Sequence, residues 1–390
     1  MGVDVVSLGC RLNLAESERL RVMLAGADDL VVVNSCAVTG EAVRQTRQAI
    51  RRARRARPEA RLVVTGCAAE VERGALLAMP EVDGLVANAA KLDPRAWNAG
   101  PVAAAPARSH TRAYVAVQTG CDHACTFCVI PQGRGPSRSV ATAEVLRDVA
   151  RHLADGSMEV VLTGVDLTSW GHDLPGEPRL GALAAAILAE FPGLPRLRLS
   201  SLDGIEIDPL LLDLLCGEAR VMPHVHLSLQ HGHDMILKRM KRRHLRADAE
   251  ALVARLRSAR PEIAVGADLI AGFPTEDEAM HAANLSAVRE LGVVHGHVFP
   301  YSARGGTPAA LMPQVPAAVI CERAAQVRGA VAAVRSEWLH GLLGRPLTVL
   351  AERDGTGHAP NFARVRLAPG TPPGEIVTIV PTRIEEGLLA

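Results

Sequence analysis

Cys121, Cys125 and Cys128 stand close together in a C-x3-C-x2-C pattern. Three thiolates at such a spacing can hold three corners of a four-iron cube and leave the fourth iron open to another ligand. The alternatives are a zinc site, for which His123 could be recruited, and a reactive pair of thiols. No fourth ligand follows at the spacing of a zinc finger, so the pattern favours a 4Fe-4S cluster. We expect His123 to be a solvent-facing loop residue.

A second group of cysteines is spread over the first seventy residues. Cys10, Cys36 and Cys67 each follow an apolar run that is typical of a β-strand. The carboxyl ends of parallel strands line one edge of a sheet, so three distant thiols can meet there. The pattern predicts a second three-ligand 4Fe-4S cluster, and the alternative is three separate buried cysteines. Cys216 and Cys321 stand alone in helical patterns, and we expect them to be core or surface thiols.

The elements around the second group predict a small α/β domain over residues 1–92. Apolar strand patterns at 3–8, 30–34 and 62–65 alternate with helical patterns at 14–24, 41–57 and 71–77. This rhythm is typical of a parallel sheet. A segment rich in Pro, Ala and Gly follows at 93–107 and predicts a linker.

Residues 108–343 repeat the strand and helix rhythm at larger scale. The expected strands lie at 114–117, 159–163, 196–200, 224–229, 263–269 and 293–299, and a long helix is expected at 316–343. Six repeats favour a partial (β/α)6 barrel over a doubly wound sheet. The C-x3-C-x2-C loop follows the first strand, and loops after barrel strands lie at the face where active sites gather. Short strand patterns over residues 344–390 predict a small all-β domain.

Composition narrows the class of protein further. The chain has 390 residues and a net charge of +1. No run of roughly 18 apolar residues and no targeting segment is recognised, so we expect a cytoplasmic protein without membrane spans. Thiols stay reduced in that compartment, which favours metal ligation over disulfides for the clustered cysteines.

The aromatic Phe127 before Cys128 and the sequence Val-Ile-Pro after it make the first motif resemble the radical S-adenosylmethionine superfamily. The resemblance implies that the open iron chelates S-adenosylmethionine, whose cleavage yields a 5′-deoxyadenosyl radical. It also implies that Phe127 and four residues at strand ends contact this cofactor, namely Gly164, Ser200, Gln230 and Asp268. The alternative for each of these four is an ordinary satisfied group at a strand end.

Both cysteine groups, in this order and followed by a short β domain, resemble the methylthiotransferase family over nearly the whole chain. The resemblance implies a C-terminal domain of the RNA-binding kind called TRAM. It also implies that a methylthio group is added to an unactivated C–H carbon with two S-adenosylmethionine molecules per turnover. Residues 38–55, 164–171 and 297–304 look most like the branch that modifies C2 of N6-threonylcarbamoyladenosine beside the tRNA anticodon. The alternatives are a methylthiotransferase acting on an aspartate of a ribosomal protein, and an electron carrier with two clusters.

Local charge supports an RNA substrate. Residues 41–61 hold eight arginines and two glutamates, and residues 238–246 hold six Lys or Arg and no acid. On a helix, Arg44, Arg47 and Arg51 fall on one side with Arg54 and Arg55, within about 100°. We expect these, with Arg242 and Arg243, to contact phosphates, and the alternative is a solvated charged face. The chemistry also requires an electron donor such as a flavodoxin or ferredoxin and a sulfur source, and we expect a monomer.

Overall fold

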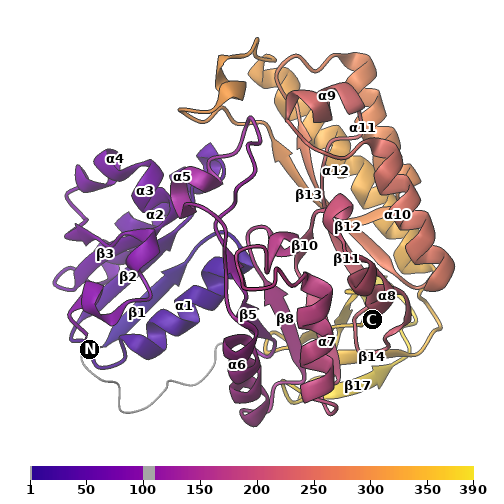
Figure 1. The fold of residues 1–390 in the computed structure, drawn as a ribbon, viewed down its shortest axis with the longest axis horizontal. Coiled ribbons are helices and arrows are strands. Elements are labelled where there is room, and N and C mark those ends of the chain that lie inside the picture. Colours follow the sequence, from indigo (N-terminus) through magenta and orange to yellow (C-terminus); the bar gives the residue numbers. More distant parts are fainter. Residues whose placement is uncertain (1, 100–109) are drawn as a thin grey trace. The chain divides into compact units, whose positions relative to one another are not determined.

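The computed structural model describes residues 2–99 and 110–390, which form two compact units (Figure 1). Unit 1 holds the described residues up to Ala99 together with Thr119–Arg138 and Ser302–Ala310. Unit 2 holds His110–Gln118, Ser139–Tyr301 and Leu311–Ala390. Of the expected linker at 93–107, residues 100–107 lie outside the described part of the chain, and η2 (Pro94–Trp97) falls within the rest.

Unit 1 is built on a parallel sheet in the order β1-β2-β3-β4. Its strands are β1 (Val3–Ser7), β2 (Leu30–Ser35), β3 (Arg61–Gly66) and β4 (Gly84–Leu85). Its helices are α1 (Arg11–Met23), α2 (Gly40–Ala56), α3 (Cys67–Val71), α4 (Arg73–Leu77), η1 (Asn88–Ala90) and α5 (Ile130–Arg134). The β4 strand is an addition to the three strands that the sequence predicts.

The two faces of this sheet are covered by different helices (Figure 1). Leu20 of α1 and Leu24, which directly follows this helix, pack with the side chains of Val5, Val32 and Val63. Val43 and Ile50 of α2 pack on the opposite face, with Val31, Val33, Leu62 and Val64. Strands buried on both faces read as continuous apolar runs, which is why the sequence reveals them.

Unit 2 contains six parallel strands arranged as the sequence predicts for a partial barrel. The strands are β5 (Ala113–Ala116), β8 (Glu159–Thr163), β9 (Arg196–Leu199), β11 (His224–Gln230), β12 (Ala264–Ala271) and β13 (Val293–Pro300). Hydrogen bonding breaks at Ser200 into the ladders β5-β8-β9 and β10-β11-β12-β13, where β10 (Ser201–Leu202) continues the line of β9. The short strands β6 (Gln118–Thr119) and β7 (Arg138–Ser139) pair with each other.

Helices cover the outside of these strands (Figure 1). They are α6 (Thr142–Ala154), η3 (Leu167–Ser169), α7 (Leu180–Glu190), η4 (Gly204–Glu206), α8 (Pro209–Gly217), α9 (Asp234–Arg239), α10 (Arg246–Ala259), α11 (Glu278–Glu290) and α12 (Ala317–His340). Along the chain, η5 (Pro308–Leu311) comes before α12, and its first three residues belong to unit 1. Their apolar faces and the strands form one core that runs from Ala113 to Val331. The α/β fold that the sequence predicts is therefore confirmed.

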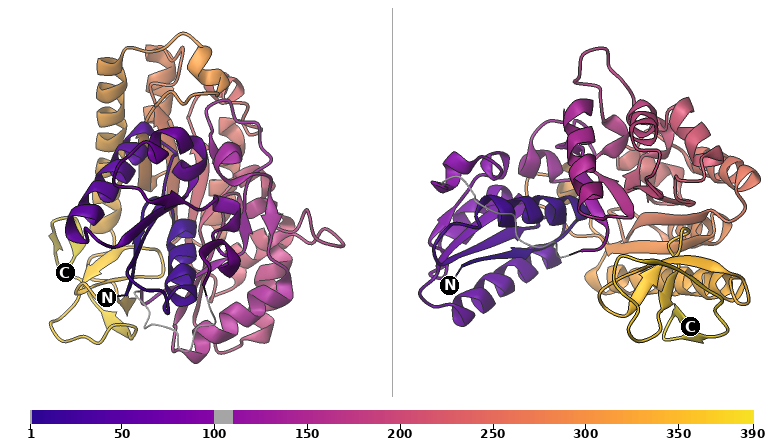
Figure 2. Two further views of the ribbon diagram at one scale, coloured as in Figure 1. Left: turned by 90° about the vertical axis from the view of Figure 1, so that its left-hand side faces the viewer. Right: turned by 90° about the horizontal axis from the view of Figure 1, so that it is seen from below.

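A mixed six-stranded sheet ends the chain, in the order β17-β14-β15-β16-β19-β18. Its strands are β14 (Leu347–Ala351), β15 (Thr356–His358), β16 (Arg364–Arg366), β17 (Ile376–Ile379), β18 (Ile384–Glu385) and β19 (Leu388–Leu389). The right-hand view of Figure 2 shows this sheet below the barrel strands of the same unit.

Phe362 joins that sheet to the amino ends of the barrel strands. Its ring centroid lies 4.9 Å from that of His224 on β11 and 5.4 Å from that of His295 on β13. Arg196 donates to the carbonyl oxygens of His358 and Thr348, at 3.0 and 2.9 Å. The sheet therefore packs at the end of the barrel opposite to the carboxyl ends of its strands.

Within the described residues, no helix is both long enough and apolar enough to cross a membrane. All eight cysteines are free thiols.

Candidate functional site

Cys10, Cys36 and Cys67 lie at one edge of the unit 1 sheet. Strand register pairs Ser7 with Asn34 and Ser35 with Gly66. Cys36 and Cys67 directly follow these paired positions, and Cys10 comes three residues after Ser7. The parallel strands therefore deliver the three thiols to the same edge, in the arrangement that the sequence predicts.

Close backbone packing around these thiols depends on glycine. Gly9 has a φ of +89°, and a Cβ atom there would lie 2.7 Å from Cys36 Sγ. Gly66 has a φ of +90°, and its Cβ atom would lie 2.5 Å from the carbonyl oxygen of Ser35. Any side chain at either position would collide with its neighbours, so the glycines permit the approach of the strand ends.

The thiols differ in their exposure to solvent. Cys36 and Cys67 are each 7% exposed, whereas Cys10 is exposed. The pKa of the Cys36 thiol is raised to about 11, mainly by burial, and the nearby Cys10 and Cys67 act in the same direction. Burial likewise raises the pKa of Cys67, while the positive charges of Arg134 and Lys91 oppose that shift. A thiolate here needs a metal or a cation to stabilise it.

The cysteines of the C-x3-C-x2-C pattern lie on the loop between β6 and α5, also in unit 1. Cys121, Cys125 and Cys128 are all half-buried, as is Phe127. The Cys121 amide donates to the carbonyl oxygen of Gly135 at 3.2 Å, and the Ile130 amide lies 3.4 Å from Cys128 Sγ. These backbone contacts give the loop a defined path.

Gly120 begins this loop with a φ of +76°. A Cβ atom at residue 120 would lie 1.9 Å from the carbonyl oxygen of Pro136. The Ser137 amide donates to Asp122 Oδ1 at 3.1 Å on the same side. The loop is therefore held against residues 135–137, and only glycine fits where it starts.

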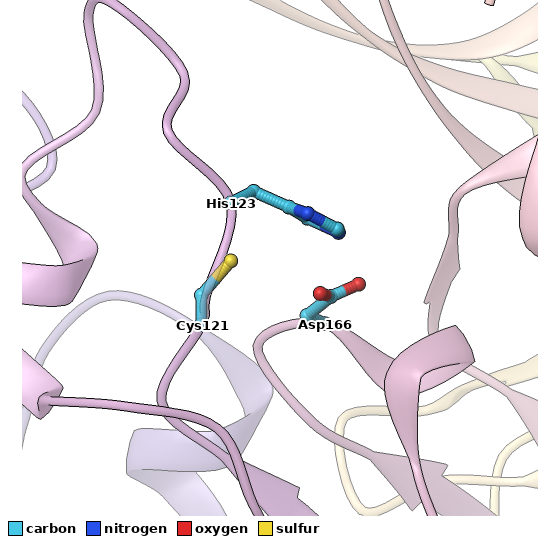
Figure 3. A group of neighbouring side chains, drawn as sticks. All are labelled: Cys121, His123 and Asp166. Carbon is cyan, nitrogen blue, oxygen red and sulfur yellow. The ribbon is translucent and has the colours of Figure 1, made fainter. Parts of the chain in front are cut away.

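His123 lies nearer to the first thiol of the loop than the sequence predicts. It is half-buried, and a ring nitrogen lies within 4.8 Å of Cys121 Sγ. Figure 3 shows both side chains leaving the loop on the same side. Geometry therefore allows this histidine to approach a metal at the thiols, although the sequence predicts a purely solvent-facing residue.

Gly164, after β8, packs against a side chain of its own unit. A Cβ atom at this position would lie 2.9 Å from Gln118 Oε1. That oxygen also accepts hydrogen bonds from the amides of Val165 and Asp166, at 3.0 and 2.9 Å. Gln118 thus fills the space beside Gly164 and holds the turn, a role that the sequence does not reveal.

Ser200 and Gln230 occupy irregular positions at strand ends. Ser200 is 6% exposed, and its hydroxyl has no hydrogen-bond partner among the described residues. It lies at the break between β9 and β10. Gln230 ends β11 with a φ of +66°, beside a register shift in the ladder with β12. Strained backbone and an unused polar group are typical of ligand sites.

Asp268, in the middle of β12, is held by two histidines. His226 Nε2 and His297 Nδ1 both lie 3.0 Å from Asp268 Oδ1. Burial alone would raise the pKa of Asp268, but its hydrogen bonds with His226 and His297 outweigh that effect and lower it. Asp268 Oδ2 has a 3.5 Å contact with the Ser201 hydroxyl. The carboxylate is therefore ionised and fixed in orientation.

The arginines expected to contact RNA fall into two environments. Arg44, Arg47 and Arg51 lie on α2 and pair with Glu41, Glu72 and Glu81. Arg242 has a side chain only 8% exposed and donates to Asp203 at 2.8 Å. Arg243 is about half exposed and pairs with Glu206 at 2.6 Å.

Acidic neighbours therefore offset the predicted basic surfaces. Arg52 and Arg55, on α2, are exposed and have no ion pair among the described residues. The burial of Arg242 indicates a structural role. The α2 surface remains the better candidate for contact with phosphates, because exposed ion pairs are weak and phosphate can replace the carboxylate.

Three charged residues beside Cys10, Cys36 and Cys67 are not among the site residues that the sequence predicts. Glu16, Lys91 and Arg134 form a buried ion-pair network in unit 1. The signal that could reveal Glu16 is its spacing, because Asn13 and Glu16 follow Cys10 at intervals of three residues on one side of α1. No local signal marks Lys91.

Two family profiles match separate parts of the chain. The Radical SAM superfamily matches residues 115–285, and the Uncharacterized protein family UPF0004 matches residues 2–87. The first match spans Cys121, Cys125 and Cys128 with most of the barrel, and the second spans Cys10, Cys36 and Cys67.

Curated relatives extend the similarity to the whole chain. A threonylcarbamoyladenosine tRNA methylthiotransferase, MtaB, of Rickettsia prowazekii (strain Madrid E) is 41% identical over 99% of this chain and 96% of its own length. A tRNA-2-methylthio-N(6)-dimethylallyladenosine synthase of Chloroflexus aurantiacus (strain ATCC 29366 / DSM 635 / J-10-fl) is 33% identical over 90% of this chain and 82% of its own length.

Among solved structures, the radical S-adenosylmethionine methyltransferase TsrM of Kitasatospora setae aligns with a TM-score of 0.55. It is 18% identical and covers 76% of this chain and 66% of its own, which supports the fold. The cobalamin-dependent radical enzyme OxsB aligns with a TM-score of 0.50 at 10% identity, over 84% of this chain and 56% of its own. On the full-length similarity to the curated relatives, the chain belongs to the radical S-adenosylmethionine methylthiotransferase family.

Proposed function

We propose that this enzyme adds a methylthio group to C2 of N6-threonylcarbamoyladenosine beside the anticodon of tRNA. The observation that carries the proposal is the meeting of Cys10, Cys36 and Cys67 at one sheet edge. The same chain also holds three cysteines at C-x3-C-x2-C spacing. The relative of Rickettsia prowazekii, whose name specifies threonylcarbamoyladenosine tRNA, supports the substrate. The family accounts for the chemistry, because acid or base catalysis cannot open an unactivated C–H bond.

The donor atoms fit two iron–sulfur clusters. Each group offers three sulfurs, and soft thiolates are the usual ligands of such clusters. Cys36 and Cys67 are buried while Cys10 is exposed, so a cluster held by them would keep one open side. Glycine at position 9 leaves room beside Cys36. We therefore assign Cys10, Cys36 and Cys67 to the second cluster, and Cys121, Cys125 and Cys128 to the cluster that binds S-adenosylmethionine.

When bound, these groups supply a 5′-deoxyadenosyl radical that removes the substrate hydrogen, and sulfur that reaches the resulting carbon. The protein's own residues bind and orient them. Asp268 is an ionised acceptor whose Oδ1 is held by two histidines, so its Oδ2 can accept a hydrogen bond from the cofactor. The hydroxyl of Ser200 is a further donor at the strand ends. Gly164 and Gln230 are proposed to contact the same cofactor, and Phe127, beside Cys128, is proposed to contact it from the cysteine loop.

Substrate binding is proposed to use the α2 surface. Arg44, Arg47 and Arg51 lie there with the exposed Arg52 and Arg55. Phosphate contacts of this kind contribute affinity without base recognition. The reaction also needs an electron donor, such as a flavodoxin or ferredoxin, and a sulfur source. We propose that the enzyme is monomeric and cytoplasmic, which is consistent with a tRNA substrate.

The decisive test is mass spectrometry of tRNA nucleosides from a strain that lacks this protein. We expect loss of 2-methylthio-N6-threonylcarbamoyladenosine and its return with the wild-type chain. Cys36→Ala and Cys125→Ala should fail to restore it. Cys216→Ala and Cys321→Ala, which alter cysteines outside both groups, are the matched controls and should restore it. An unchanged nucleoside level in the deletion strain, with loss of methylthio-aspartate from a ribosomal protein, would refute the tRNA substrate.

A further inference from the structure

A buried network of charged residues lies beside Cys10, Cys36 and Cys67. Glu16 of α1 is 5% exposed, Lys91 is 1% exposed and Arg134, at the end of α5, is 6% exposed. Lys91 Nζ lies 2.5 Å from Glu16 Oε2, and Arg134 donates to both Glu16 oxygens at 2.9 Å. Asn13 Oδ1 accepts from Arg134 at 2.5 Å, and Asn34 Oδ1 lies 3.3 Å from Lys91 Nζ.

The charges of this network do not cancel. Two cations face one carboxylate, and no second carboxylate pairs with either cation in the described part of the chain. The remaining hydrogen bonds go to neutral groups, namely the two asparagines and the Thr119 hydroxyl. One net positive charge is therefore buried, and an isolated buried charge of this kind is strongly unfavourable.

The thiols of Cys36 and Cys67 are neighbouring groups that could carry the opposite charge. Arg134 acts electrostatically on Cys36 and Cys67, and Lys91 acts on Cys67. Gly133 precedes Arg134, and a Cβ atom on Gly133 would lie 3.1 Å from Cys67 Cβ. Asn88 joins the same two segments, because its Nδ2 donates to the Gly133 carbonyl at 2.5 Å and lies 3.9 Å from Cys67 Sγ.

The net positive charge of the network indicates which form of the three cysteines it would stabilise. Three neutral thiols would leave its positive charge without a counterpart. A four-iron core of charge two plus, bound by three thiolates, carries one net negative charge, and its one-electron reduction adds another. A neighbouring positive charge stabilises both states and favours the reduced state more.

We propose that Lys91 and Arg134, held in place by Glu16, are positioning residues that supply the countercharge of the cluster at Cys10, Cys36 and Cys67 and raise its reduction potential. This inference rests on the second cluster of the proposed function. A purely structural role, in which the ion pairs only tie α1 to α5, predicts lower stability for every disruptive variant and no relation between the sign of the charge change and the potential.

The test uses the full-length chain with Cys121, Cys125 and Cys128 changed to alanine, so that one cluster remains. After anaerobic reconstitution, iron content is measured and the reduction potential is read by electron paramagnetic resonance during redox titration. Glu16→Gln raises the buried charge by one, and Lys91→Met lowers it by one. Arg134→Lys keeps the charge and is the matched control.

We expect Glu16→Gln to raise the potential and Lys91→Met to lower it, each by a tenfold change in the reduction equilibrium constant, about 59 mV for one electron. Arg134→Lys should stay near the unmodified value. If Lys91→Met does not fold, Arg134→Gln compared with Arg134→Lys gives the same charge change.

Shifts of the same sign in Glu16→Gln and Lys91→Met, or no shift with iron retained, would overturn this inference and leave the second cluster intact. If the triple-alanine chain with Glu16, Lys91 and Arg134 unchanged binds no iron, the second cluster itself is overturned. This inference is then overturned with it.

Discussion

Arg198 donates to Glu159 at 2.7 Å between β9 and β8, and both side chains are fully buried. Burial alone would raise the pKa of Glu159, but the charge and hydrogen bonds of Arg198, helped by Arg112 and Arg196, lower it to about 2 from its ordinary 4.5. The folded state therefore favours ionised Glu159. Its contribution to stability is complete above about pH 4.5 and is lost as the pH falls towards 2.

The first prediction concerns this pair. Glu159→Gln should lower the free energy of unfolding by about 3–5 kcal/mol at pH 7, because it leaves Arg198 buried without its counterion. The difference from wild type should shrink between pH 4.5 and pH 3, where wild-type Glu159 loses its advantage. Urea unfolding at several pH values measures both effects.

Asp213→Asn is the matched control for that measurement. Asp213 pairs with Arg255 at 3.8 Å, and both side chains are well exposed. Exposed pairs contribute little, so this variant should unfold like the wild type at every pH. A Glu159→Gln deficit of equal size at pH 3 and pH 7 would show that the ionised carboxylate is not its source.

The second prediction concerns Gly9. Gly9→Ala should lower stability by about 1–3 kcal/mol, because residue 9 has a positive φ and a new Cβ atom would collide with Cys36. Displacing Cys36 should also reduce the iron retained after anaerobic reconstitution. Gly26→Ala is the control, since no atom lies within 4 Å of a Cβ there and its φ is not positive. Full iron content in Gly9→Ala would contradict the assigned position of Cys36 in the cluster.

The third prediction concerns Asp268. Asp268→Asn should weaken S-adenosylmethionine binding about tenfold or more, because a hydrogen bond to a charged group contributes roughly 1.5–3 kcal/mol. Equilibrium dialysis under anaerobic conditions measures the affinity. Ser228→Ala, which removes a neutral hydroxyl bonded to Ser201 at 2.9 Å, should have the smaller effect. Equal affinity in Asp268→Asn and wild type would remove Asp268 from the cofactor surface.

The fourth prediction concerns the α2 surface. The double change Arg52→Glu and Arg55→Glu should weaken tRNA binding and reduce the slope of log affinity against log salt by about one per lost phosphate contact. Filter binding over a series of salt concentrations measures both quantities. Arg255→Glu with Arg328→Glu makes the same charge change on α10 and α12 and should have little effect. Equal losses in both double variants would indicate a general charge effect and no specific RNA surface.

Long apolar elements could be predicted from the sequence with close agreement. The strand expected at 159–163 is β8, with the same bounds, and the strand expected at 30–34 is β2, which is one residue longer. All five residues of β8 are buried, and Val160, Val161 and Leu162 form its apolar run. The strands β4 and β10 contain two residues each and offer no periodicity to detect.

Some parts of the candidate site could be predicted from the sequence and others could not. Strand ends could place Cys10, Cys36 and Cys67 together, because parallel topology decides where those ends lie. Ion pairs could not be predicted, since they join residues far apart in the chain. Lys91 and Glu16 are 75 residues apart, and Arg242 and Asp203 are 39 apart. The sequence therefore shows six clustered cysteines but not the buried cations beside them, nor that Arg242 points into the protein.

The position of Phe362 shows that the sheet of the last six strands covers the amino ends of the barrel strands. Its ring lies against His224 and His295, and Arg198 stands 4.9 Å from its centroid. A chain that ends after Leu343 would lack this sheet, so the amino ends of the barrel strands would be exposed to water. Arg196 and Arg198 would also lose the carbonyl oxygens that they now contact. Deletion of this sheet would thus report on barrel integrity. Charge changes on the outer strands of this sheet leave its packing against the barrel in place. Such changes can therefore test whether the sheet contacts RNA.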